Sequence, residues 1–352
     1  MRGAALISSL CLVWAASASA APGGRRFLDA VERLRNDPRW QGRMEAAVAL
    51  GSAEDPRALR PLVEALEDDH FAVRAAVVRA LVRLQDARAV PAILDHVADP
   101  EPFVRTEARK GAAQFDLQEA KPYLVNALRR HPDVRVRLLA CERLAEHLDA
   151  DTVEVLLDAT SDRDPVGRFA VAAVAALPPE QATQAFLRGL KHQDYLVQVA
   201  SIRALADAGA PEATEALVNM LDAQVPEVMV AATEAVHRLK QHLDVQRYRV
   251  LALRAKRRFD RARALKVLGI LGDEESRRIL LGALDDPDLV VRSAAVSALA
   301  SLGELRALPQ LEQMRTQEEN ARILAALKIA LSQLRRLRDA AEAPAPTAAQ
   351  TP

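Results

Sequence analysis

Residues 73–81 read VRAAVVRAL, and this short stretch decides the fold because its pattern returns along most of the chain. Taking Arg74 as the marker, the equivalent positions are Arg43, Arg74, Arg105, Arg137, Arg168, Gln198, Met229, Arg261 and Arg292, called ladder positions below. They are separated by 31, 31, 32, 31, 30, 31, 32 and 31 residues. Such a regular period is typical of a repeat protein.

Each ladder position begins a pattern with helical spacing. Three residues later the side chain is small or β-branched, as at Ala46 and Val77, and seven residues later it is almost always aliphatic, as at Leu50 and Leu81. These spacings place the apolar side chains on one face of an α-helix. Each repeat has a second helix in its other half. Prolines, which helices tolerate in their first turn, mark this helix at Pro61, Pro91, Pro122 and Pro309. The sequence therefore predicts an all-α stack of helix pairs, each burying its apolar face against its neighbours.

The composition excludes several classes of protein. Of the 352 residues, 50% are hydrophobic, which is too many for a disordered chain, and two cysteines are too few for a disulfide scaffold. The 48 basic and 48 acidic residues give no net charge, whereas nucleic-acid binders usually carry a basic excess. Only 3% of the residues are aromatic, so few aromatic side chains are available to line a ligand pocket.

The two ends of the chain differ from the repeats. Arg2, the apolar run from Ala4 to Ala16 and the small residues Ala18-Ser19-Ala20 follow the pattern of a secretory signal peptide. We expect cleavage after Ala20, export to a bacterial periplasm or the medium, and no transmembrane segment after the signal is removed. We further expect a flexible leader at 21–26, the repeats at 27–339 and a disordered Ala/Pro-rich tail at 340–352.

The pattern Asp-x5-Arg-x2-Ala-x3-Leu, with a proline opening the other helix, resembles the HEAT repeat, particularly its short PBS-lyase-like form. The resemblance covers residues 27–338 and implies an α-solenoid, a right-handed superhelix of about ten antiparallel helix pairs of ~31 residues. In HEAT proteins the acid and the arginine form a structural ladder between successive turns. The pairs to which this role is assigned are Asp37/Arg43, Asp68/Arg74, Asp99/Arg105, Asp162/Arg168 and Asp286/Arg292.

A search for catalytic chemistry finds no motif. The sequence has no Gly-rich phosphate loop, no G-x-S-x-G, no H-E-x-x-H and no paired C-x-x-C. It has no His-Glu dipeptide, the pair that forms the metal sites of the HEAT-repeat iron hydroxylases, and Cys141 stands where other repeats have apolar core residues. Every repeat is 30 to 32 residues long, so no loop has grown to carry a catalytic group. We therefore expect no catalytic residue, metal, cofactor or enzyme activity.

A row of charged side chains is the first candidate binding feature. It lies five and nine residues after the ladder positions, away from the aliphatic stripe. By resemblance to HEAT solenoids, whose second helices line the concave side, this row lines a groove. The candidate partner-binding residues are Arg79, Arg83, Lys110, Glu142, Glu146, Arg203, Glu234 and Arg238. The sign of the charge alternates, which suits a protein or peptide better than a polyanion. A solvated helix face is the alternative interpretation.

A basic cluster is the second candidate. Residues 247–263 contain eight basic residues and one acid, where the acid–arginine pattern has changed to His192/Gln198, Ala223/Met229 and Ala255/Arg261. The candidate anion-binding residues are Arg254, Lys256, Arg257, Arg258, Arg261 and Arg263. The alternative is that arginines extend over the surface beside a decayed ladder.

The sequence thus supports two classes of function. The first is an exported, non-catalytic scaffold that binds a protein or peptide partner through its concave helix face. The second is a peripheral binder of an anionic membrane surface or polymer through residues 247–263. A weaker alternative, a lyase-like chaperone for a cofactor, rests on the name of the repeat subfamily. We expect no nucleic-acid partner.

Overall fold

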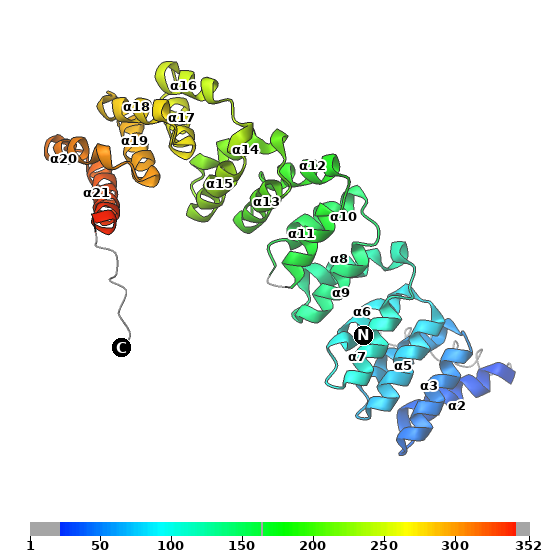
Figure 1. Cartoon of the computed structure of the whole chain (residues 1–352). Helices are drawn as coiled ribbons and strands as arrows, with labels where there is room; N and C mark the ends of the chain where they lie inside the picture. Colours follow the sequence, from blue (N-terminus) through cyan, green and yellow to red (C-terminus); the bar gives the residue numbers. More distant parts are fainter. Residues whose placement is uncertain (1–21, 163–164, 343–352) are drawn as a thin grey trace, which may run out of the picture. The chain divides into compact units, whose positions relative to one another are not determined.

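The computed structural model describes residues 22–162 and 165–342, and these residues form helices and turns without any strand. The predicted signal peptide, the cleavage site after Ala20 and residues 343–352 of the predicted tail lie outside the described residues. The chain divides into two compact units, Met1–Val174 and Ala175–Pro352 (Figure 1). Within each unit the helices stack in antiparallel pairs, which confirms the predicted all-α solenoid fold.

Unit 1 holds the first five helix pairs. Its α-helices are α2 (Pro22–Asn36), α3 (Trp40–Ser52), α4 (Leu59–Glu64), α5 (Phe71–Leu84), α6 (Val90–Asp95), α7 (Pro102–Ala112), α8 (Leu117–Arg130), α9 (Val134–Leu144), α10 (Ala150–Ala159) and α11 (Val166–Ala175), which ends one residue into unit 2. Short 3₁₀ turns flank some of them: η1 (Pro56–Ala58), η2 (Ala65–Glu67), η3 (Ala87–Ala89) and η4 (His96–Ala98). The second helices α3, α5 and α7 pack side by side.

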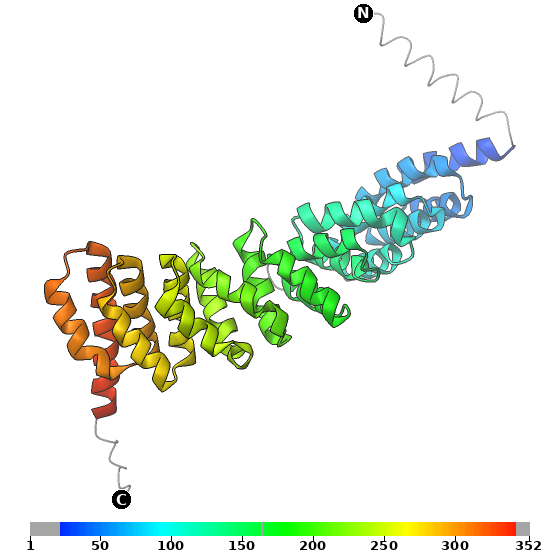
Figure 2. The ribbon, with the colours of Figure 1, turned by 90° about the horizontal axis from the view of Figure 1, so that it is seen from above.

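Unit 2 continues the same organisation. Its α-helices are α12 (Pro179–Gly189), α13 (Tyr195–Asp207), α14 (Thr214–Asn219), α15 (Pro226–Arg238), α16 (Val245–Arg254), α17 (Arg258–Leu271), α18 (Glu274–Gly282), α19 (Leu289–Leu302), α20 (Leu308–Gln317) and α21 (Ala321–Glu342). The 3₁₀ turns are η5 (Pro211–Ala213), η6 (Met220–Asp222), η7 (Lys240–His242), η8 (Ala283–Asp285) and η9 (Leu305–Ala307). Figure 2 shows the pairs following one another in chain order within each unit.

Sequence chemistry explains where the helices begin and end. Aspartates precede many of them, and the side chains of Asp133, Asp194 and Asp288 each accept a hydrogen bond from the backbone amide two residues later. Such caps satisfy amides that have no partner inside the helix. Gly272 and Gly303 end α17 and α19 with left-handed φ angles of 66° and 69°, which glycine adopts without a steric penalty.

The core follows the predicted stripe in most repeats. The aliphatic residues seven positions after the ladder positions are almost fully buried, for example Leu50, Leu81 and Leu268. The exception is α11, where the expected core residues Val171 and Ala175 are half-buried and exposed, while Ala170 and Val174 are buried. The buried face of α11 is therefore displaced by one residue, next to the shortest interval between ladder positions. Repeat alignment cannot reveal such a displacement, because a deletion can be placed on either side of the helix.

Both predicted end segments are more helical than expected where they are described. The described residues of the leader expected at 21–26, residues 22–26, are part of α2, which begins at Pro22 and packs on α3. Proline is compatible with a first helical turn. The tail expected from residue 340 begins inside α21, which continues to Glu342. Leu331 and Leu334 of α21 are buried, so packing against the preceding helices stabilises this long final helix.

Candidate functional site

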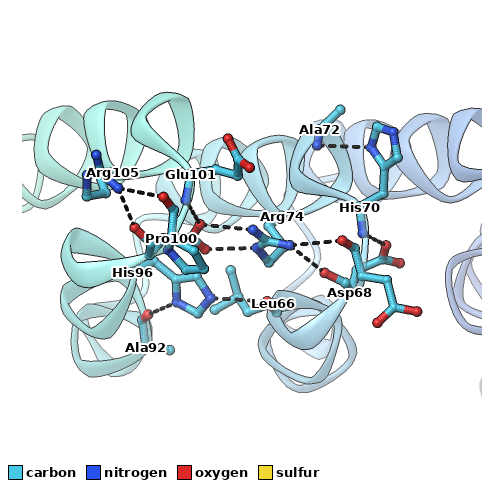
Figure 3. A network of polar contacts seen from close by, with 12 residues as sticks. Leu66, Asp68, His70, Ala72, Arg74, Ala92, His96, Pro100, Glu101 and Arg105 are labelled. Atoms are coloured by element: carbon cyan, nitrogen blue, oxygen red, sulfur yellow. Dashed lines mark hydrogen bonds and ion pairs between the residues drawn. The ribbon is translucent and has the colours of Figure 1, made fainter.

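Arginine–aspartate contacts join successive repeats of unit 1 (Figure 3). Arg74 on α5 donates from Nε and Nη2 to the two carboxylate oxygens of Asp99, at 2.8 and 2.9 Å, and from Nη1 to the Asp68 carbonyl at 2.8 Å. Arg43 binds the Asp68 carboxylate at 2.5 and 2.8 Å and the Asp37 carbonyl at 3.0 Å. Each arginine thus binds the backbone of the acid six residues earlier and the carboxylate of the acid in the next repeat. The spacing of six predicts the first contact but not the second.

Burial and hydrogen bonding act in opposite directions on the ladder carboxylates. Desolvation raises the pKa of Asp68 and Asp99. Hydrogen bonds from Arg43 and Arg74 and from the following backbone amides lower these pKa values by more than desolvation raises them, so both lie below the ordinary value. Asp99 is only 5% exposed, so its charge depends on these donors. The ladder is therefore a set of charged, structural contacts.

The acid–arginine spacing left the ladder position Arg137 out of the predicted pairs, and one residue that it included, Arg168, differs from the others in exposure. Arg137 donates to the Asp162 carboxylate at 2.6 and 3.0 Å and to the His131 carbonyl at 2.9 Å. It was missed because His131 stands where the pattern requires an acid. Arg168, which the pattern includes, is exposed, unlike the half-buried Arg74. Its exposure agrees with the displaced face of α11.

The ladder changes again in unit 2. Gln198 keeps the backbone bond, donating to the His192 carbonyl at 2.7 Å, whereas Met229 has no group that can donate. The Arg261 and Arg292 side chains resume the pattern, binding Asp286 at 3.2 Å and Glu318 at 3.1 Å.

A different pair of cations supports the repeat that contains Met229. Arg263 Nε donates to Asp222 Oδ2 at 2.6 Å, and Lys266 Nζ donates to Asp222 Oδ1 at 2.9 Å. Both cations lie on α17 and reach back to η6 of the preceding repeat. Because these contacts span more than 40 residues, the repeat period does not predict them.

The predicted charged row occupies one surface of the second helices in unit 1. Arg79 and Arg83 on α5, Lys110 on α7 and Glu146 just past the end of α9 are exposed, and Glu142 on α9 is half-buried. Several members contact a neighbour: Arg83 donates to Ser52 on α3 at 3.0 Å, Glu142 accepts from Arg109, and Glu146 accepts from Arg143. Arg79 also lies 3.4 Å from Glu107 on α7, so Arg83 and Lys110 are the cations of this row without an ion pair among the described residues.

The predicted row in unit 2 carries mixed charges. Arg203 on α13 and Glu234 on α15 are exposed, and Arg238 on α15 donates to Asp207 on α13 at 2.5 Å. These side chains therefore lie on one surface, but opposite charges offset one another there.

An aromatic strip in unit 1 was not predicted. Trp40 on α3 stacks on His70 with ring centroids 4.2 Å apart, His70 stacks on Phe71 at 5.1 Å, and Phe71 meets Phe103 on α7 edge-to-face at 6.5 Å. Phe71 and Phe103 remain 41% and 47% exposed. The Arg79 guanidinium lies 5.9 Å from the Phe103 ring centroid, which joins the strip to the charged row. The available signal was the recurrence of scarce aromatics two or three residues before ladder positions.

The basic cluster separates into two groups. Arg247, Arg249, Arg261 and Arg263 are neutralised by Glu215, Asp273, Asp286 and Asp222, respectively. The predicted anion-binding roles of Arg261 and Arg263 are therefore weakened, because each guanidinium is already bound to a carboxylate. The exposed residues Arg254, Lys256 and Arg257 form no ion pair with any described residue, and Arg258 lies 3.9 Å from Asp288.

Other candidate chemistry was sought in the described part of the chain. Cys141 is fully buried, and burial raises the pKa of its thiol to about 12. Residues 22–162 and 165–342 contain no group of three or more His, Cys, Asp or Glu residues placed to hold a metal ion. None of the helices in these ranges combines the length and apolarity needed to cross a bilayer.

Comparisons with known proteins agree with the repeat architecture. A family model described as HEAT repeats matches residues 28–113, 121–190, 166–237 and 249–332. Among curated proteins, deoxyhypusine hydroxylase-B of Oryza sativa subsp. japonica is 25% identical over 295 residues, covering 79% of this chain and 90% of that protein. Among solved structures, Kap121p bound to Pho4p is 13% identical, with a TM-score of 0.40, over 87% of this chain and 41% of that chain. Human deoxyhypusine hydroxylase in complex with glycerol is 20% identical, with a TM-score of 0.28, over 79% and 96%.

The rice relative corrects one expectation. We expected the chain not to be an enzyme, and this relative contradicts that expectation, because it is an enzyme that aligns with most of the chain. The expectation assumed that a catalytic group needs an enlarged loop. Side chains on the helices themselves can supply such groups, so a constant repeat length does not exclude catalysis.

Proposed function

This chain belongs to the HEAT-repeat family, and from that premise we propose that it is an exported scaffold that binds an extended segment of a protein partner. Unit 1 provides the binding surface, made of the aromatic strip and the cations Arg79, Arg83 and Lys110. This is the face that the sequence predicts to be concave. Repeat proteins offer such extended surfaces because equivalent positions recur from one helix pair to the next.

The observation that carries the proposal is the exposure of Phe71 and Phe103 beside these cations. Aromatic residues and arginine are enriched among the residues that dominate binding energy at protein interfaces. In a chain with 3% aromatic residues, two exposed rings in contact across successive repeats stand out from the surrounding surface. Packing between the helices does not require this exposure, since the repeat cores consist mainly of aliphatic residues and the aromatic residues among them, such as Phe115 and Phe186, are buried.

The chemistry of the surface restricts the partner. The exposed rings favour a segment with apolar or aromatic side chains, and Arg79, Arg83 and Lys110 favour acidic groups beside them. Glu142 follows on the next second helix, α9, and Glu146 lies just past the end of that helix, so the row changes from basic to acidic along unit 1. A segment with acidic residues at one end and basic residues at the other would complement this order.

Site-specific photocrosslinking in cells tests the proposal. A photoreactive residue at position 103 should form an adduct with a defined partner. The same residue at position 60 is the control. Arg60 has an 88% exposed side chain but lies on the first helix α4, outside the proposed surface, so it should form no such adduct. Replacing Phe71 and Phe103 with serine should then weaken binding of the purified partner at least 10-fold, with circular dichroism unchanged. Equal adducts at both positions, or unchanged affinity, would refute the assignment of the surface.

Export is a separate part of the proposal and rests on the sequence pattern of residues 1–20. After expression in a bacterium, the mature protein should appear in the periplasm or medium with Ala21 as its first residue. N-terminal sequencing gives this directly. An intact Met1 in the cytoplasmic fraction would remove export without affecting the proposed binding surface.

A second candidate function comes from the rice relative, whose alignment with this chain covers 79% of its residues at 25% identity. Purified chain can be incubated with iron(II) and a substrate that contains deoxyhypusine, and mass spectrometry can detect the addition of one oxygen atom. The described residues do not fit an iron site, because no three candidate ligands lie together and the chain has no His-Glu pair. We therefore assign no residue to this activity.

A further inference from the structure

The end of α16 differs from the ends of most other first helices. Where a first helix closes with a 3₁₀ turn, the residue two positions before its C-cap is buried. These residues are Leu66, Val97, Leu221 and Leu284, with exposures of 2%, 4%, 1% and 2%. In α16 the α-helix continues to the C-cap at Ala255, and the equivalent residue, Leu253, is 63% exposed.

The geometry of the helix end explains the exposure of Leu253. The C-cap amide of η2, at Asp68, bonds to the carbonyl three residues earlier, whereas that of α16 bonds to the carbonyl four residues earlier, Leu251. The longer bond turns the side chain two positions before the cap outward and leaves Ala252 buried. Three other first helices, α2, α8 and α20, end in the same way, and they carry polar residues at the outward position, Arg35, Arg129 and Thr316. Only α16 of these four first helices presents an apolar side chain there.

The surrounding surface is both apolar and cationic. Val250, one turn before Leu253 on α16, is 55% exposed, and Phe259 in the first turn of α17 is 56% exposed. Four exposed cations surround the junction of the two helices: Arg254 ends α16, Lys256 and Arg257 lie in the short connection, and Arg258 begins α17. We call these seven residues the 250–259 edge. Of its charges, the first three have no ion-pair partner among the described residues, and the fourth lies 3.9 Å from Asp288.

We propose that the 250–259 edge docks unit 2 on the surface of an anionic phospholipid bilayer. Peripheral binding of this kind combines cations at the level of the headgroups with apolar side chains that enter the boundary with the acyl chains. Leu253 and Phe259 supply the apolar groups, and Arg254, Lys256 and Arg257 supply the uncompensated charge. An anionic polymer would satisfy the cations but would leave the apolar side chains in water, so the edge suits a bilayer better.

The test uses the full chain with vesicles of phosphatidylcholine alone or mixed with phosphatidylglycerol, measured by co-sedimentation. We expect binding to the anionic vesicles only. Replacing Arg254, Lys256 and Arg257 with glutamine should weaken that binding about fivefold for each charge removed, or on the order of 100-fold together. Raising the salt from 0.1 to 1 M should weaken it too, since the screening length falls from about 10 Å to about 3 Å.

Apolar variants separate a bilayer from an anionic polymer. Replacing Leu253 and Phe259 with serine should lower vesicle binding at least 10-fold. The control is Phe103→Ser, which removes an exposed phenylalanine from the equivalent repeat position in unit 1. This variant should leave vesicle binding unchanged. Phe259→Trp should increase the tryptophan emission, and anionic vesicles should shift this added emission to shorter wavelength. Absent vesicle binding, or binding that needs the cations but is unchanged by the loss of Leu253 and Phe259, would overturn the proposal.

Discussion

Replacement of Arg74 by methionine tests whether the ladder in unit 1 is a coupled structural element. Arg74 binds the Asp99 carboxylate with two hydrogen bonds and the Asp68 carbonyl with a third. The Asp99 side chain is only 2% exposed, so the substitution leaves a buried charge without its counterion. The chain itself suggests the matched variant, because Met229 and Ala255 occupy the equivalent positions in unit 2.

The structure allows the two variants to be compared in energy. Removal of one partner from a buried ion pair costs 3–5 kcal/mol, and the partly accessible Arg74 places the single variant at about 3 kcal/mol. In Arg74→Met with Asp99→Ala no charge remains buried. The main loss is then the hydrogen bond from the Glu101 amide to Asp99, about 1 kcal/mol. The double variant should therefore be more stable than the single variant by about 2 kcal/mol.

Hydrogen exchange on the full chain is the suitable assay, because solenoids open locally and one unfolding temperature does not describe them. In Arg74→Met, amides of α5 and α7 should exchange on the order of 100-fold faster, as about 3 kcal/mol implies. Much of the protection should return in the double variant, and α19 in unit 2 should be unchanged in both. A double variant that exchanges as fast as the single variant, or faster, would refute the proposed coupling.

Three further predictions follow from the described contacts. Because the pKa values of the ladder aspartates are lowered, their contribution to stability is complete above about pH 4 and is lost as the pH falls through their folded pKa values. Helix content followed by circular dichroism at a fixed temperature from pH 5 to 2.5 should show this loss, and the double variant should show less of it. In a denaturant titration, Gly51→Val should destabilise unit 1 by about 1–3 kcal/mol, since even a Cβ there would lie 2.6 Å from the Ala80 Cα. The control Gly282→Ala, with no atom within 4 Å of the new Cβ, should be neutral or slightly stabilising in that titration. Cys141 should resist thiol reagents at pH 8 until urea unfolds the chain, and rapid labelling of the folded protein would contradict its burial.

Repeat period and apolar spacing were sufficient to predict the fold. Leu50 and Leu81 are buried because every second helix presents the same stripe to its neighbours, so a local pattern determines a long-range contact. The prediction fails at α11, where Val174 rather than Ala175 is buried. A shift of one residue rotates the buried face of a helix by about 100°. Where the interval between ladder positions is short, as after Arg168, the spacing of side chains in one sequence does not show on which side of the helix the residue is missing.

The candidate sites were less predictable for a related reason. The charged row could be located because it lies at fixed distances from the ladder positions. The contribution of Phe103 could not, since its exposure and its contact with Arg79 depend on how two helices meet. The basic cluster can be found by counting charges along the sequence, but such counting could not distinguish Arg263, which binds Asp222, from Arg257, which remains exposed. Such distinctions require the positions of the acids in neighbouring helices.

The changed ladder contact joins two successive repeats, with Met229 on α15 and Ala255 at the C-cap of α16, and it therefore meets the 250–259 edge at the end of α16. Met229 and Ala255 have replaced the arginine and the acid together, so neither position leaves an unpaired charge. The same helix, α16, lacks the closing 3₁₀ turn that buries Leu66 and Leu221 elsewhere, and Leu253 therefore faces solvent. Decay of the ladder alone would explain the lost ion pair, but it would not explain an apolar side chain at a position where α8 and α20 carry polar ones. The junction of these repeats has thus exchanged a polar contact between helices for an exposed apolar and cationic surface, which is the change expected if that surface has a partner of its own.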